Sequence, residues 1–177
     1  MVNWREFARE APALAALGRE RFDSTELVLM GTSRKDGSPR VTPIEFFFFE
    51  GELTLAGMWQ SRKLVDVLRD PRCVLHSTVT NKSGTEGDFK LAGRAAPIDG
   101  SEERERYARA LRAATGWAPE EPFHLFQLDI REAAYVVFGT AVKAALERLA
   151  GTPGVDARIL PNTEEGYLVA TWKAAAG

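Results

Sequence analysis

The sequence has little cysteine and histidine, the residues from which zinc sites and many catalytic centres are built. It contains one cysteine, Cys73, and two histidines, His76 and His124, among 177 residues. A single cysteine excludes an internal disulfide framework and any site built from several cysteines, and it favours a reducing, cytoplasmic setting. Cys73 and His76 stand three residues apart in a predicted strand, so they face opposite sides and cannot share a metal. We therefore expect no metal site.

The sequence also lacks an excess of charge of either sign and any long apolar run. Its 23 Lys and Arg residues against 25 Asp and Glu residues give a formal net charge of -2. This balance excludes a strongly basic protein that binds nucleic acid by neutralising phosphates. No stretch approaches the ~18 consecutive apolar residues of a membrane span. Residues 1–9 carry alternating charges and do not have the pattern of a signal peptide. We expect neither a nucleic-acid partner nor a membrane partner.

Motifs of several familiar chemistries are missing as well. The chain has no Walker loop, no GxGxxG turn after a strand and no GxSxG elbow. A hydrolytic triad would need His76 or His124 as its base, and nothing in the neighbouring sequence marks either one. A polar position in the core or at a sheet edge is the better interpretation of both histidines. No side chain has the pattern of an obligatory acid–base catalyst.

Hydrophobic periodicity predicts many short strands and few helices. An N-terminal helix is expected at about 3–18, where Asn3 and Glu6 fit a capping box and Pro12 breaks or kinks the helix. Further helices are expected at 61–69, about 101–115 and 141–150. Strands are expected at 27–34, 40–49, 52–56, 73–80, 88–98, 123–130 and 133–138. After about residue 150, glycine, proline and polar residues dominate and the pattern predicts no further element.

No internal repeat or linker divides the chain. We expect one domain over residues 1–177, with the N-terminal helix at about 3–18 and a C-terminal extension at about 140–177. The dipeptide Asp36-Gly37 predicts a two-residue type I′ hairpin turn, because both central residues of that turn need a positive φ.

The run Phe46-Phe47-Phe48-Phe49 is apolar on both faces of its strand. Such a strand must be covered on both sides by a helix or by a partner chain. Short hairpins and a two-sided apolar strand favour a closed or partly closed barrel, in which helices cover the openings. The run is also one reason to expect a homodimer.

Two short segments carry candidate binding residues. Ser61-Arg62-Lys63 opens a helix, where free backbone N–H groups, a hydroxyl and two cations together favour an anion, most simply a phosphate. Arg40-Val41-Thr42-Pro43-Ile44 contains a proline that cannot donate to a ladder, which places this part of the strand at an edge or bulge. Taken singly, a solvated helix start and a proline-protected edge strand explain these segments equally well.

Their order along the chain resembles the pyridoxamine 5′-phosphate oxidase-like, flavin-binding split-barrel superfamily. The resemblance runs from about Leu27 to Ala96. The matching stretches are 36–43, 61–63, 69–72 and 88–95.

The resemblance implies a mainly β fold with flanking helices, namely a six-stranded antiparallel Greek-key split barrel that works as a homodimer. Flavin mononucleotide (FMN), or a deazaflavin in some branches, would lie between the two subunits. Arg40, Val41, Thr42 and Pro43 match the strand beside the isoalloxazine ring. Ser61, Arg62 and Lys63 match the helix start that binds the phosphate. Asp88 would be contributed by the second subunit. In this family the flavin carries the electron chemistry, and Arg40 would place positive charge near N1 and O2 of the ring.

Two departures from the family pattern concern the substrate. True pyridoxamine phosphate oxidases carry a lysine where this chain has Glu45, and they end in an Arg-x-His motif that residues 167–177 lack. A carboxylate beside a phosphate-bearing substrate is unfavourable. The resemblance therefore implies a different small organic substrate.

The sequence leaves four kinds of protein open. The leading hypothesis is a flavin-dependent oxidoreductase. The alternatives are a non-enzymatic protein that binds flavin or haem, a deazaflavin-dependent reductase, and a barrel whose cofactor site has decayed. The retention of Ser61, Arg62 and Lys63 argues against the decayed barrel.

Overall fold

The computed structural model describes residues 1–161 and 166–175. Within them, eight strands form one antiparallel sheet in the order β3-β2-β1-β4-β5-β6-β8-β7, and β3 also pairs with β6. The strands are β1 (Leu27–Ser33), β2 (Pro39–Phe49), β3 (Glu52–Met58), β4 (Arg72–Ser77), β5 (Asp88–Pro97), β6 (Phe123–Phe138), β7 (Asp156–Leu160) and β8 (Tyr167–Lys173). The helices are α1 (Trp4–Glu10), α2 (Pro12–Asp23), α3 (Arg62–Arg69), α4 (Ser101–Thr115) and α5 (Ala141–Leu149).

The pairing of β3 with β6 closes the first six strands into a barrel. Strand β4 returns to lie beside β1 after the meander of β1, β2 and β3, which is a Greek-key arrangement. The expected fold class, a mainly β protein with a six-stranded antiparallel barrel and flanking helices, is confirmed. None of the helices in the described part of the chain is long and apolar enough to cross a membrane.

The N-terminal segment forms two helices, where one interrupted helix at about 3–18 was expected. The predicted capping box is present, because Asn3 Oδ1 accepts from the Glu6 N–H at 3.0 Å and Glu6 Oε2 accepts from the Asn3 N–H at 3.1 Å. Pro12 begins α2, since the first position of a helix needs no N–H donor. Gly18 does not end the helix. A Cβ at Gly18 would lie 2.4 Å from the Phe89 ring, so close packing explains this glycine.

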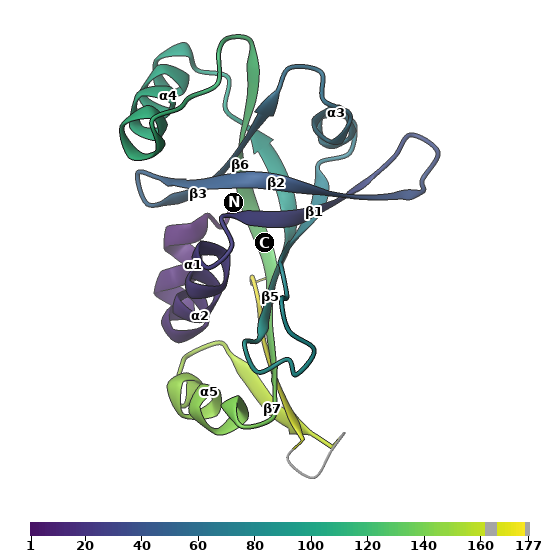
Figure 1. The fold of residues 1–177 in the computed structure, drawn as a ribbon, viewed down its shortest axis with the longest axis vertical. Coiled ribbons are helices and arrows are strands. Elements are labelled where there is room, and N and C mark those ends of the chain that lie inside the picture. Colours follow the sequence, from purple (N-terminus) through teal and green to yellow (C-terminus); the bar gives the residue numbers. More distant parts are fainter. Residues whose placement is uncertain (162–165, 176–177) are drawn as a thin grey trace.

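The chain's own helices cover both faces of the phenylalanine run. The Phe46 ring lies 5.5 Å from Phe22 of α2, and α1 and α2 lie on one side of β2 in Figure 1. On the other side, the Tyr107 ring of α4 lies 6.0 Å from Phe47 and 5.7 Å from Phe49. Helices of the same chain therefore contact both faces of the run, but only Phe49 is fully buried, and Phe46, Phe47 and Phe48 stay partly exposed. The homodimer expected from this run stays a prediction.

The first hairpin differs from the prediction in its turn. Of the loop residues 34–38 only Gly37 has a positive φ, at 84°. The Gly37 N–H donates to the Arg34 carbonyl at 2.9 Å, and the Arg34 N–H donates to the Ser38 carbonyl at 2.8 Å. This is a three-residue loop with a left-handed glycine in its last position. The two-residue turn with two positive φ angles occurs instead at Glu50-Gly51, between β2 and β3.

The strands expected at 123–130 and 133–138 form one continuous strand, β6. Ala92 faces Glu132 and Gly93 faces Ile130, so Arg131 is an extra residue in a β-bulge. The first part of β6 pairs with β3, and the part after the bulge pairs with β8.

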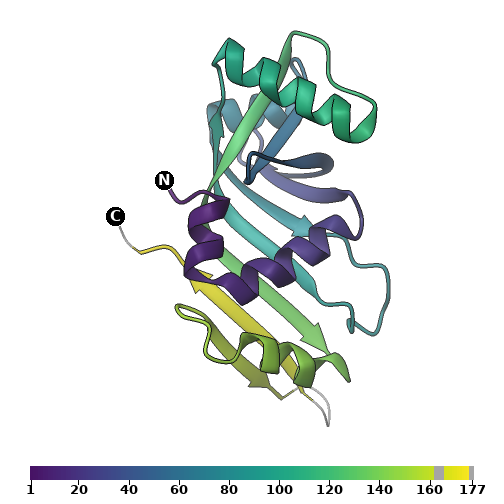
Figure 2. The same cartoon turned by 90° about the vertical axis from the view of Figure 1, so that its left-hand side faces the viewer.

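The C-terminal extension contains more structure than its sequence pattern predicts. The helix expected at 141–150 is present as α5, but β7 and β8 were not predicted. In β8, Leu168, Ala170 and Trp172 are buried and alternate with partly exposed residues. Figure 2 shows this extension beside the second half of β6, below the barrel. The extension thus lengthens the sheet and leaves the barrel itself unchanged.

Candidate functional site

The site begins at the turn that leads from β3 into α3. Gln60 has a left-handed φ of 58°, and the Ser61 N–H donates to the Met58 carbonyl at 3.1 Å. The Gln60 N–H donates to Nε2 of His124 at 3.2 Å, which ties the turn to β6. Burial lowers the pKa of His124, and this favours the neutral ring that can accept the bond. His124 is therefore a structural residue of the turn, in agreement with its sequence interpretation.

Ser61 and Lys63 lie at the start of α3 as the sequence predicts. Ser61 occupies the N-cap position but its side chain makes no capping bond. Lys63 Nζ donates to the Pro43 carbonyl at 2.5 Å, so it joins the helix start to β2. Burial lowers the pKa of Lys63, and the charge of Glu45 acts in the opposite direction. Arg62 is exposed and forms no ion pair with any described residue.

The segment Arg40–Pro43 lies at an open edge, as the proline predicts. Strand β2 pairs with β1 from Pro39 to Glu45 but pairs with β3 only from Phe46 to Phe49. Residues 40–43 therefore have a neighbouring strand on one side only. The exposed side chains of Val41 and Pro43 alternate with the partly buried side chains of Arg40 and Thr42. The two predicted segments meet at this edge, through the contact of Lys63 with Pro43.

A second contact between the segments involves a residue that the sequence analysis missed. Asp66 of α3 is 4% exposed and accepts from Arg40 Nε at 2.7 Å. It also accepts from Arg69 Nη1 at 3.2 Å and from Thr32 Oγ1 at 3.3 Å. Burial alone would raise the pKa of Asp66, but the hydrogen bonds from Arg40 and Arg69 outweigh it and hold the pKa below its ordinary value. Asp66 thus fixes the Arg40 side chain against α3.

Asp66 lies on the face of α3 that points into the protein. Of the apolar residues Leu64, Val65 and Leu68, only Leu64 is fully buried, whereas Val65 is 38% and Leu68 is 50% exposed. The buried residues of α3 are Leu64, Asp66 and Val67. The face of α3 that points into the protein is therefore partly polar.

Two predicted site residues hold buried hydroxyls without a partner. Thr42 Oγ1 and Ser61 Oγ are both buried and make no hydrogen bond within the described residues. Such orphaned polar atoms are costly, since they lose water without gaining another partner. They are what a ligand with several oxygen and nitrogen atoms would satisfy.

Asp88 does not join these residues within one chain. Its carboxylate lies 3.0 Å from Lys90 Nζ and 3.7 Å from His76 Nε2. Leu29 of β1 faces both Pro43 of β2 and His76 of β4, and β5 follows β4 in the sheet. Asp88 therefore lies three strands away from the edge at Pro43.

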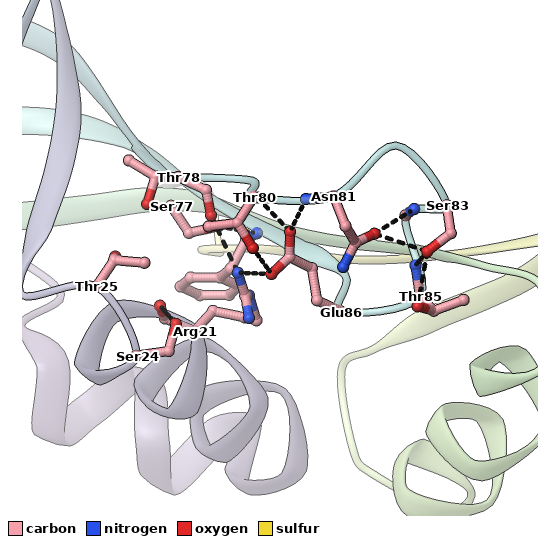
Figure 3. A network of polar contacts seen from close by, with 12 residues as sticks. Arg21, Ser24, Thr25, Ser77, Thr78, Thr80, Asn81, Ser83, Thr85 and Glu86 are labelled. Atoms are coloured by element: carbon pink, nitrogen blue, oxygen red, sulfur yellow. Dashed lines mark hydrogen bonds and ion pairs between the residues drawn. The ribbon is translucent and has the colours of Figure 1, made fainter.

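The loop before Asp88 is fastened to α2 (Figure 3). Arg21 Nη2 lies 3.2 Å from Glu86 Oε2. Glu86 also accepts from the Thr80 N–H, from Thr80 Oγ1 at 2.9 Å and from the Asn81 N–H at 3.0 Å. These bonds hold the pKa of Glu86 below its ordinary value, although burial opposes them. The network fixes the start of β5 and hence the position of Asp88.

No group of three or more His, Cys, Asp or Glu residues is placed to hold a metal ion in the part of the chain that the structure describes. The fold and the site define a class of protein, the six-stranded split barrel with a polar corner between β2 and the start of α3.

Solved structures with the same fold are found among bacterial proteins. A conserved hypothetical protein from Mycobacterium tuberculosis is 19% identical, covering 64% of this chain and 78% of that chain with a TM-score of 0.55. General Stress Protein 26 from Bacillus anthracis is 19% identical, covering 68% and 91% with a TM-score of 0.52. A Clostridium acetobutylicum protein related to general stress protein 26, of the pyridoxinephosphate oxidase family, is 14% identical, covering 66% and 83% with a TM-score of 0.53. These likenesses establish the fold. No curated protein matches the sequence.

The model of the pyridoxamine 5′-phosphate oxidase family matches residues 16–137, which is more than half of the chain. The chain belongs to this family, and the resemblance drawn from the sequence is confirmed.

Proposed function

We propose that the chain is a flavin-dependent oxidoreductase that binds FMN where β2 meets the start of α3. One observation carries the proposal. Thr42 and Ser61, which the sequence assigns to the cofactor site, are two of the buried side chains whose hydroxyls have no partner in the described residues. They come from different elements that the contact between Lys63 and Pro43 brings together.

The residues at this corner fit a phosphate-bearing cofactor. Arg62 is exposed and can move toward a phosphate, and the first N–H groups of α3 have no helical partner. Lys63 can exchange the Pro43 carbonyl for a phosphate oxygen, because a charged acceptor binds an ammonium more strongly than a neutral one. When bound, a flavin supplies the transfer of hydride or single electrons.

The chain's own residues would hold and orient that group. Asp66 fixes the Arg40 guanidinium by an ion pair to its Nε, and this leaves the terminal nitrogens of Arg40 for a ligand. A cation held there favours a reduced, anionic ring over a neutral one. The exposed outer face of Val41 and Pro43 gives a flat apolar surface beside it.

A homodimer is part of this proposal. The outer face of β2, β1 and β4 carries the exposed apolar side chains of Val41, Leu27 and Val74, which are 65%, 40% and 38% exposed. Gly31 separates Val41 from Val74 in the register of the sheet and allows a close approach there. A second copy of the chain that docks on this face would cover these residues, and its Asp88 would reach the cofactor site of the first.

The experiment that tests this function is the visible spectrum of the purified protein, with mass spectrometry of whatever acid releases. The proposal expects flavin absorbance and the mass of FMN, and bleaching of the absorbance by a chemical reductant. A released deazaflavin would support the reductase alternative. A released haem would contradict the proposal, and so would a protein that stays colourless and binds neither FMN nor a deazaflavin when they are added.

A further inference from the structure

A cavity of about 930 Å³ lies between α2, β2 and α4. Its size falls within the range of small-molecule sites, which is roughly 300–1,000 Å³. It forms because β1 begins only at Leu27, which faces Glu45. The four phenylalanines that follow Glu45 in β2 therefore have no neighbouring strand on that side. In Figure 1 α4 lies on one side of β2, and α1 and α2 lie on the other. The cavity occupies the space that the missing strand would fill.

Aromatic rings form much of its wall. Phe46, Phe47, Phe48, Tyr107 and Trp117 all line it. Burial raises the pKa of Tyr107, so this residue stays a neutral phenol. The Trp117 side chain is 57% exposed, which is unusual for so large an apolar group and places an indole at the mouth of the cavity. Such walls suit a flat apolar ligand, which can stack on several rings.

The charge at the cavity is negative. Arg19, Asp23, Glu26 and Glu45 line it. Arg19 forms an ion pair with Asp23, with 2.6 Å between Nε and Oδ2, so these two charges balance each other. Its guanidinium also lies 3.7 Å from the centre of the Phe48 ring. Glu26 and Glu45 form no ion pair with any described residue. Lys63 acts on Glu45 only beyond ion-pair distance. Two carboxylates without an ion pair at an aromatic cavity attract cations and repel phosphates and carboxylates.

The cavity adjoins the proposed cofactor site along one strand. Val41, Pro43, Glu45 and Phe47 alternate along β2, so they share its outer face. Val41 and Pro43 belong to the candidate cofactor segment, Arg40–Pro43, which we call the strip. Glu45 and Phe47 line the cavity. Glu45 is near enough to both to influence the pKa values of Lys63 and Tyr107. A ligand in the cavity would therefore lie next to a flavin bound at the strip.

We infer that this cavity binds the substrate, and that the substrate class is a small molecule with a flat apolar body and a positively charged amine or amidine group. The aromatic wall would take the flat body, and Glu45 and Glu26 would take the cation. The ligand can be called a substrate only if the proposed flavin function holds, and to that extent the inference rests on the proposed function. The preference for a cationic aromatic ligand rests on the cavity alone.

Three probes with one ring system and different charge test this preference. They are 1-naphthylmethylamine, 1-naphthalenemethanol and 1-naphthoate, titrated by calorimetry into the protein as purified. We expect the amine to bind about tenfold or more tightly than the naphthoate, with the alcohol between them. The difference should shrink at high salt, because Glu26 and Glu45 are both exposed. Glu45→Gln and the double variant Glu26→Gln, Glu45→Gln should reduce the preference, whereas Glu147→Gln on the exposed face of α5 should not.

The outcomes separate this inference from the proposed function. If the amine binds in a Glu45-dependent way but the protein takes up no flavin, the cavity assignment stands and the oxidoreductase fails. If FMN binds but the three probes bind equally or the naphthoate binds best, the cationic substrate class is wrong. The cationic substrate class is also wrong if Glu45→Gln and the double variant bind the amine as tightly as the wild type. FMN affinity, measured in parallel, should not fall in Glu45→Gln, since the proposal gives Glu45 no contact with the phosphate.

Discussion

Arg40 and Asp66 form an ion pair that joins the candidate cofactor strand to α3, with 2.7 Å between Nε and Oδ2. The two residues come from different elements, and each is placed by its own element. Arg40 follows the hairpin loop at the open edge of β2, and Asp66 lies on the inner face of the helix that opens with Ser61-Arg62-Lys63. One contact therefore fixes the cation of the proposed ring site relative to the cations of the proposed phosphate site.

We predict that Asp66→Asn weakens both the fold and the cofactor site. Loss of the charged acceptor weakens its bonds to Arg40 and Arg69 and should lower the free energy of unfolding by about 1–3 kcal/mol. FMN affinity should fall roughly tenfold, because Arg40 is no longer fixed. Asp70→Asn is a matched control, since Asp70 pairs with the exposed Arg72 at 2.6 Å. Urea unfolding and FMN titration of both variants provide the measurement. Equal losses in the two variants would contradict the role of Asp66.

The same pair predicts a pH dependence of stability. The pKa of Asp66 is lower in the folded protein than its ordinary value, so the pair stabilises the fold above the ordinary pKa. This stability is lost as the pH falls through the lowered pKa of the folded state. We expect the wild type to exceed Asp66→Asn by a constant amount above about pH 5 and by less below about pH 4. A difference that grows toward acid pH would have the wrong sign.

Much of the fold follows from sequence patterns, and the exceptions have physical causes. The alternation of the strands and the capping box at Asn3 are local features, and both are present. The type I′ turn expected at Asp36-Gly37 is absent, because only Gly37 has a positive φ there. The end of α2 could not be predicted, because Gly18 is explained only by its packing against Phe89, far away in the sequence. Strands β7 and β8 were missed because they are stabilised by pairing, which the local sequence does not show. Strand β8 pairs with β6, and β7 pairs with β8.

The structure brings residues 40–43 and 61–63 together through the contact of Lys63 with Pro43. Their role as a cofactor site stays a prediction. Asp66 was missed because a carboxylate in a helix usually faces water, and only the two arginines that fold against it make its burial favourable. The cavity was missed because it depends on where β1 begins relative to β2.

Gly18→Ala tests the packing of α2 on the barrel. In an open helical position this change stabilises a protein by about 0.5–1 kcal/mol. Here the new Cβ would lie 2.4 Å from the Phe89 ring, so we expect a loss of about 1–3 kcal/mol. Ala16→Gly, at an exposed position of the same helix, should cost only about 0.5–1 kcal/mol. Denaturant unfolding compares the two, and a gain in stability for Gly18→Ala would show that the helix does not pack as described.

Val41→Glu tests the proposed dimer face. A carboxylate in place of an outward-facing apolar side chain should disfavour association and yield a folded monomer. Ile159→Glu, on β7 and 50% exposed, should leave the oligomeric state unchanged. Light scattering at micromolar concentration measures both. A wild-type protein that is already a monodisperse monomer would refute the dimer.

Pyridoxamine phosphate should be a poor substrate. Glu45 repels a phosphate at the cavity, and Glu26 adds a second negative charge. We expect no useful turnover by the FMN-loaded protein, measured as formation of pyridoxal phosphate by its absorbance. Rapid turnover would show that other cations of the chain compensate for these carboxylates.

The central claim, that FMN binds where β2 meets α3, is tested most directly by titrating FMN and riboflavin into protein stripped of cofactor. The wild type should bind FMN about 10- to 1,000-fold more tightly than riboflavin, because a ligand without the phosphate leaves the cations and N–H groups there unpaired. In the double variant Arg62→Ala, Lys63→Ala this ratio should fall toward one, while Lys143→Ala on α5 should keep it. Equal binding of FMN by the wild type and the double variant would place the phosphate elsewhere and contradict the account.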